Sequence, residues 1–75
     1  PNLFSLYVRY GRSIEMIRGG VMNIAEAVKI LYDISRKLQP HDGELARGIQ
    51  ICAEKLRVKK DFLDEDDMAE IRRAI

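Results

Sequence analysis

Histidine and cysteine each occur once in this chain, as His41 and Cys52, and tryptophan does not occur. A single cysteine cannot form an intrachain disulfide, which favours a reducing environment inside the cell. A structural zinc site needs paired cysteines or histidines at short spacing, and the sequence has neither. A catalytic site would have equally few candidate residues. The sequence therefore predicts no disulfide, no metal, no cofactor and no enzymatic activity.

The chain also lacks a long apolar run. Charged residues interrupt the N-terminal segment at Arg9, Arg12, Glu15 and Arg18. We therefore expect neither a signal peptide nor a membrane span, and we expect a cytoplasmic location. The chain starts with proline rather than methionine and ends within a predicted helix. The length of 75 residues predicts a single helical domain over residues 1–75, and these ends indicate processing or excision from a longer chain.

Charged residues make up 33% of the sequence, but the formal net charge is only +1. Acids occur in residues 42–44 and 64–67, and bases occur in residues 36–37 and 55–60. Acids near the start of a helix and bases near its end complement the helix macrodipole. The charges therefore predict where helices begin and end, and no remaining charge cluster requires a catalytic or phosphate-binding site.

An all-α fold follows from segments whose apolar residues recur every three or four positions. The clearest segment is residues 23–38, in which Asn23 is the expected N-cap and Pro40 stops the pattern. Its predicted buried face consists of Ile24, Ala27, Val28, Leu31, Ile34 and Leu38. We predict a helix over these residues.

Two further helices are predicted over residues 43–60, with Asp42 as N-cap, and residues 64–75, with Asp64 as N-cap. The connection at residues 39–42 is short, so the first two helices should form an antiparallel hairpin. The apolar face of the second helix consists of Leu45, Ile49, Cys52 and Leu56. Cys52 is therefore expected to act as a small buried apolar residue.

The N-terminal segment is compatible with two structures. We expect a fourth helix, because its apolar residues step by three and four positions and Gly19 stands where a left-handed C-terminal residue is common. These residues are Leu3, Tyr7, Tyr10, Ile14 and Ile17. The alternative is a β-hairpin in which residues 3–10 form a strand and Gly11-Arg12 forms the turn.

Basic residues in the second helix support a nucleic-acid-binding regulator as an alternative function. The candidate contacts are Arg47, Lys55, Arg57, Lys59 and Lys60. The acids at residues 42–44 and 61–67 flank them at both ends, and acids repel phosphate. With a net charge near zero, we consider this function the less favoured one.

Apolar residues outside the main helical faces indicate a protein interface. Ile51 and Val58 lie opposite the apolar face of the second helix, and Phe4 and Val8 lie off the face of the N-terminal helix. Exposed apolar residues of this kind mark interaction surfaces. We therefore expect a non-enzymatic regulatory, adaptor or assembly module that binds a protein partner or forms a homodimer through these residues.

Overall fold

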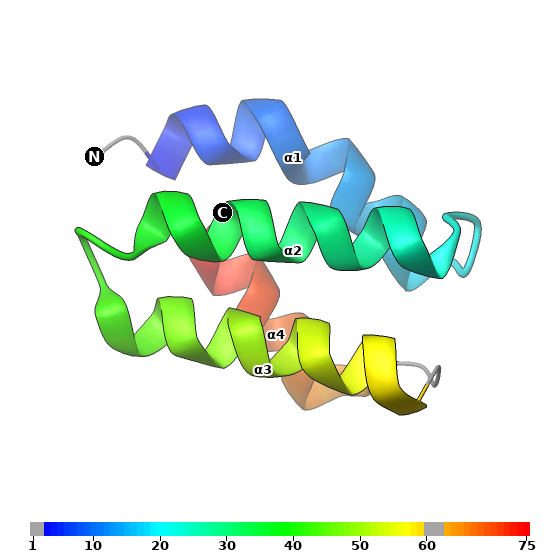
Figure 1. Ribbon diagram of the computed structural model, residues 1–75. Helices are drawn as coiled ribbons and strands as arrows, with labels where there is room; N and C mark the ends of the chain where they lie inside the picture. The colour runs from blue at the N-terminus through cyan, green and yellow to red at the C-terminus, as the bar shows by residue number, and fades with distance from the viewer. Residues whose placement is uncertain (1–2, 60–62) are drawn as a thin grey trace.

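The computed structural model describes residues 3–59 and 63–75. It contains helices α1 (Leu3–Arg18), α2 (Ile24–Leu38), α3 (Gly43–Lys59) and α4 (Glu65–Ala74), and the described residues contain no strand (Figure 1). The all-α prediction is therefore confirmed. The β-hairpin alternative for the N-terminal segment is wrong, because this segment is helical. Within these ranges, the description does not include the side chains of five residues, which are Leu3, Phe4, Ser5, Tyr7 and Lys59.

The predicted N-caps of the last three helices are all formed. Asn23 accepts a hydrogen bond from the Glu26 N–H at 3.1 Å, and Asp42 accepts one from the Leu45 N–H at 3.1 Å. Asp64 and Asp67 form a reciprocal capping box at the start of α4. Side-chain oxygens thus satisfy N–H groups that a helix start leaves without partners. The predicted end of the second helix at residue 60 lies outside the described residues.

The end of α1 differs from the prediction by one residue. The left-handed residue is Gly20, with φ of 70°, rather than Gly19. The Gly19 N–H still bonds to the Glu15 carbonyl at 3.0 Å, so the helical pattern continues one residue further than expected. The Gly20 N–H donates to the Ile17 carbonyl at 3.1 Å, and the Val21 N–H donates to the Met16 carbonyl at 3.1 Å. Together these two hydrogen bonds form a Schellman motif. This motif reverses the chain between α1 and α2.

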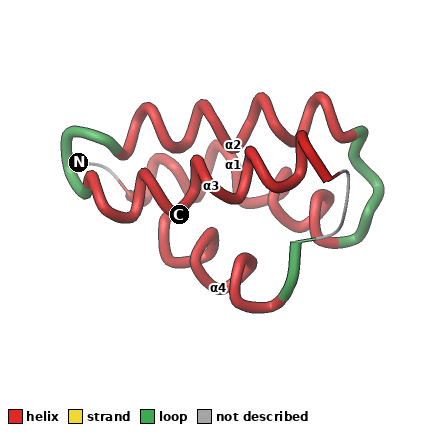
Figure 2. The backbone as a smooth tube through the Cα atoms, turned by 60° about the horizontal axis from the view of Figure 1, so that its bottom comes forward, coloured by secondary structure: helices red, strands yellow, loops and turns green. Residues whose placement is uncertain are grey.

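The helices pack in a ring in which each one contacts the next and α4 contacts α1. Figure 1 shows α2 and α3 side by side with opposite chain directions, which confirms the predicted hairpin. In Figure 2, α4 lies along the edge of the molecule away from α2. The most completely buried large side chains come from all four helices and are Ile14, Leu31, Ile34, Leu38, Ile49, Cys52 and Ile71. One apolar core therefore holds the bundle together.

The buried face of α1 differs in part from the predicted one. Tyr10, Ile14 and Ile17 are buried as expected. Leu6, which the expected face did not include, is also buried, whereas the side chains of Leu3 and Tyr7 lie outside the described part. Leu6 lies four residues before Tyr10, so both residues project from the same side of the helix toward α2 and α4.

Candidate interaction site

A polar cluster connects α1 to α2. The Tyr10 hydroxyl donates a hydrogen bond to the Asp33 carboxylate, and Lys37 Nζ donates to the same carboxylate at 3.1 Å. The hydrogen bond from Tyr10 has the largest effect on the pKa of Asp33 and that from Lys37 the next largest, and together they hold this pKa well below its usual range. Lys37 Nζ also lies 5.8 Å from the centre of the Tyr10 ring, within cation–π distance. The cluster thus fixes one helix against the other.

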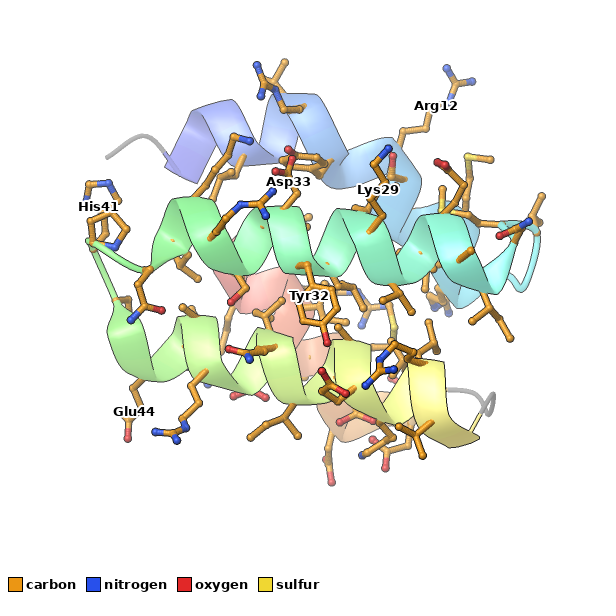
Figure 3. The ribbon with its side chains drawn as sticks, in the orientation of Figure 1. Arg12, Lys29, Tyr32, Asp33, His41 and Glu44 are labelled. Carbon is orange, nitrogen blue, oxygen red and sulfur yellow. The ribbon has the colours of Figure 1, made fainter. Side chains whose placement is uncertain are left out.

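A second cluster connects α2 to α3. Figure 3 shows Tyr32 pointing from α2 toward α3, where its hydroxyl donates a hydrogen bond to the Glu54 carboxylate. Arg57 donates to the other oxygen of Glu54 at 2.7 Å. The bond between Tyr32 and Glu54 lowers the pKa of Glu54 and raises that of Tyr32, because it requires an ionised acceptor and a protonated donor. This cluster is also part of the helix packing.

A third cluster connects α3 to α4 and contains the only cysteine of the chain. Lys55 Nζ lies 2.9 Å from Asp67 Oδ2, and the Cys52 thiol lies 3.7 Å from Asp67 Oδ1. Burial of Cys52, followed by the charge of Asp67, raises the pKa of the thiol to about 12. Such a thiol is protonated near neutral pH and is a poor nucleophile. Cys52 is 1% exposed, which confirms the prediction that it belongs to the core.

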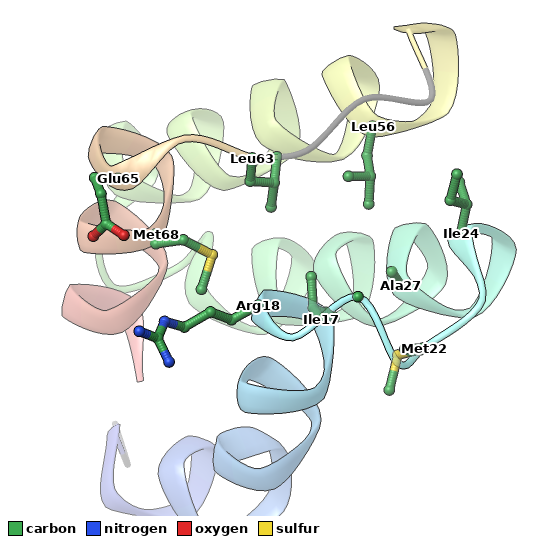
Figure 4. A pocket seen from close by; sticks show the side chains of 10 residues that line it. Ile17, Arg18, Met22, Ile24, Ala27, Leu56, Leu63, Glu65 and Met68 are labelled. Carbon is green, nitrogen blue, oxygen red and sulfur yellow. The ribbon is translucent and has the colours of Figure 1, made fainter.

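An apolar cavity of about 440 Å³ lies at the end of the bundle where α1 ends and α2 begins (Figure 4). Its lining consists of the apolar residues Ile17, Met22, Ile24, Ala27, Leu56, Leu63 and Met68, with Gly20, Arg18 and Glu65. Binding sites for organic ligands typically occupy roughly 300–1,000 Å³ and are lined mainly by apolar groups. The cavity therefore has the size and chemistry to hold an apolar group.

Local sequence features create the cavity. The Schellman motif at Gly20 turns the chain so that Met22 and Ile24 reach the same space as Ile17. The small side chain of Ala27 leaves this space open. On the other side, Leu63 precedes the N-cap of α4 and Met68 occupies its fourth helical position, the two positions of a hydrophobic staple. The cavity is thus framed by the end of α1, the starts of α2 and α4, and the face of α3.

Exposed apolar side chains lie at the same end of the bundle as the cavity, and Ile24 is part of its lining. Val21 is 73% exposed, and Met16 and Ile24 are each 38% exposed. Val21 lies next to Met16, because the Val21 N–H bonds to the Met16 carbonyl. Val58 lies in the last turn of α3. Figure 1 shows that α3 ends at the same end of the molecule as the connection between α1 and α2. Within the described residues, four of the six exposed large apolar side chains therefore lie at this end.

The residues predicted as an interface do not form one surface. Val8, Ile51 and Val58 are exposed, but Ile51 borders a groove with Arg47 on α3, whereas Val8 borders another groove between α1 and α4. Helices α1 and α3 lie on opposite sides of α2 (Figure 1). The side chain of Phe4 lies outside the described residues. Only Val58 lies at the end of the bundle that contains the cavity.

The basic residues of the nucleic-acid alternative are also dispersed. Lys55 and Arg57 pair with Asp67 and Glu54, respectively. Arg47 is exposed and lies in the first half of α3. The described structure does not include the side chains of the remaining candidates, Lys59 and Lys60. The described bases therefore form no continuous positive surface on α3.

The sequence did not identify the residues around the cavity as parts of an interaction site. Val21 and Met22 follow two glycines, and the sequence of this segment is typical of a linker. Two adjacent apolar residues in a loop are nevertheless a signal that could have indicated an interaction surface. Ile24 was expected in the buried face of α2 but is partly exposed as the first residue of the helix. The cavity itself depends on how distant segments pack, which periodicity does not reveal.

Two further findings concern metal ligands and helix length in the described residues. Within residues 3–59 and 63–75, no three acidic, histidine or cysteine side chains are grouped closely enough to hold a metal ion. None of the helices in these ranges has the length and apolar character needed to cross a membrane. The chain matches no protein-family model, no curated protein and no solved structure.

Proposed function

We propose that this chain is a non-enzymatic protein-interaction module whose apolar cavity receives an apolar side chain of a partner protein. The observation that carries the proposal is the cavity of about 440 Å³ together with the exposed residues Met16, Val21 and Ile24 beside it. Protein interfaces commonly depend on a few apolar or aromatic side chains that fill pockets of the other protein. The cavity supplies such a pocket.

A protein partner fits these observations better than a small molecule. A ligand held inside the cavity would leave the surrounding apolar residues in water, whereas a protein surface would cover them as well. Val21, at 73% exposure, is the most exposed of these residues. Arg18 and Glu65 border the cavity and could bind polar groups at the edge of the interface.

The module would act as a regulatory, adaptor or assembly domain. A cytoplasmic location is part of this proposal, because the buried thiol of Cys52 has no second cysteine with which to form a disulfide. Nucleic-acid binding stays a prediction. It is less favoured because Lys55 and Arg57 already form ion pairs within the molecule.

The test compares two exposed valines. Val21→Glu should abolish capture of the partner from a native lysate, because it places a charge beside the cavity. Val8→Glu is the matched control: Val8 is 66% exposed and lies on another groove. Captured proteins are identified by mass spectrometry with and without nuclease, and circular dichroism verifies that both variants remain helical.

A second variant tests the cavity directly. Ala27→Leu should fill part of the cavity without lowering stability, since cavity filling is a common stabilising change. The partner captured by the native chain should be retained by Val8→Glu and lost from both Val21→Glu and Ala27→Leu. The proposal fails if Val21→Glu and Ala27→Leu retain the partner. Loss of all captured material after nuclease treatment would instead support nucleic-acid binding.

A further inference from the structure

Helix α4 presents a narrow exposed face with a regular arrangement of charge. Its exposed residues are Glu65, Asp66, Ala69, Arg72 and Arg73. With 100° of rotation per residue, all five lie within about 60° on either side of Ala69. The buried residues Met68, Ile71 and Ala74 lie on the other side of the helix. The face therefore has acids at one end, bases at the other end and a small residue at its centre.

The arrangement is self-complementary. The two acids precede Ala69 by four and three positions, and the two bases follow it by three and four positions. A second α4 in the antiparallel direction, related by a two-fold axis at Ala69, would therefore place acids opposite bases at both ends. Two-fold symmetric interfaces use the same surface of both copies and require such self-complementarity. Antiparallel helix dipoles would add a further favourable interaction.

The charges of this face are available for such pairing. Among the described residues, no ion pair involves Glu65, Asp66, Arg72 or Arg73. By contrast, the neighbouring Asp67 pairs with Lys55 of α3. The helix dipole explains why acids lie near the start of α4 and bases near its end. It does not explain why the centre of the same face is an exposed alanine, which allows two helices to approach closely.

We propose that the chain self-associates through this α4 face as an antiparallel two-fold dimer. Figure 2 shows α4 along the edge of the molecule, where a second copy can approach it. Val8 and Ile75 border the adjoining groove beside Arg72 and add apolar surface next to the contact. One short helix buries less than the roughly 1,000 Å² of a stable interface, so the dimer is weak and salt-sensitive.

This surface is separate from the apolar cavity except for Glu65, which borders both. Dimerisation and partner binding are therefore tested independently. Loss of partner capture in Val21→Glu would not affect the dimer, because Val21 lies in the connection between α1 and α2.

The test uses two charge-reversed chains in sedimentation experiments at about 1 mM protein and low ionic strength. Glu65→Lys/Asp66→Lys makes the whole face basic, and Arg72→Glu/Arg73→Glu makes it acidic. Each variant alone should associate at least about tenfold more weakly than the native chain, and their equimolar mixture should recover the dimer. Lys29→Glu/Arg47→Glu, which alters exposed bases of α2 and α3, should dimerise like the native chain.

Charge reversal also weakens α4 itself, so a second variant separates the effects. Ala69→Lys keeps the charges at both ends but places like charges on the two-fold axis, and it should remain helical while losing the dimer. Dimerisation of the native chain should also decrease about tenfold between low salt and about 0.5 M salt. The proposal is overturned if the native chain is monomeric at low salt, if Ala69→Lys dimerises normally, or if the mixture of reversed chains stays monomeric.

Discussion

The Ser35 hydroxyl of α2 donates a hydrogen bond to the Ala46 carbonyl oxygen of α3 at 2.7 Å. Ser35 is 6% exposed and is the only buried polar residue among the described ones, while Ala46 is completely buried. A buried hydroxyl without a partner would oppose folding, so this bond allows serine to occupy the interface between the two helices. It also fixes the position of the two helices along each other, which apolar contacts alone specify less strictly.

Loss of this bond should cost less than loss of a core side chain. Ser35→Ala should lower the free energy of unfolding by about 1 kcal/mol, the typical net contribution of one hydrogen bond. Leu31→Ala should lower it by roughly 2–5 kcal/mol, because Leu31 is completely buried and its truncation leaves a cavity. Urea denaturation of both variants measures the order. A larger loss for Ser35→Ala would show that the polar contact dominates this interface.

Acid should weaken the contact between α1 and α2. The pKa of Asp33 is lower in the folded chain than in the unfolded chain, so its contribution to stability is present above about pH 4 and decreases as the pH falls below that value. Asp33→Asn should remove part of the difference in stability between pH 6 and pH 3. Glu44→Gln alters an exposed carboxyl and is the control. Equal acid sensitivity of Asp33→Asn and the native chain would contradict the assignment.

Cys52 should resist modification in the folded protein. Its pKa of about 12 lowers the thiolate fraction near pH 8 about a thousandfold relative to an ordinary thiol, and burial also blocks access of a reagent. Alkylation with iodoacetamide, followed by mass spectrometry, should be slow without denaturant and rapid in urea. Ile51→Cys/Cys52→Ala, which places a thiol at an exposed position of the same helix, should react rapidly in both conditions.

Two glycines should respond to alanine in opposite directions. Gly20→Ala should destabilise the protein by about 1–2 kcal/mol, because Gly20 has a φ of 70° and alanine disfavours that conformation. Gly48→Ala should stabilise α3 by about 0.5–1 kcal/mol. A Cβ at Gly48 would overlap the Glu70 carboxylate, which lies at the end of a flexible side chain and can move. Thermal melts of both variants, and of Gly48→Ala/Glu70→Ala, measure these effects.

The starts of the last three helices could be predicted from the sequence because local chemistry determines them. Asn23, Asp42 and Asp64 each accept a backbone hydrogen bond within three residues, which is a property of a few consecutive positions. The N-terminal helix could also be favoured over a hairpin. A strand would place Val8 and Tyr10 on the same face as polar residues, whereas the helix separates exposed Val8 from buried Tyr10.

The cavity could not be predicted in the same way. It requires Ile17, Ala27, Leu56 and Met68 from four helices to surround one space. Their separations depend on how the helices pack, and the sequence pattern shows only that each belongs to an apolar face. The prediction placed the left-handed residue at Gly19 instead of Gly20 for a similar reason, because two adjacent glycines can both end a helix and only the observed backbone conformation and hydrogen bonds distinguish them.

The hairpin of α2 and α3 has a kinetic consequence. Its two helices share the most extensive contact in the bundle and are joined by a short connection. Forming this contact closes only a small loop, whereas the contact between α1 and α4 brings together the two ends of the chain. Helical proteins dominated by such local contacts fold within microseconds to milliseconds. The folding nucleus should therefore lie in the hairpin, and the pairing of α1 with α4 should form last and open first.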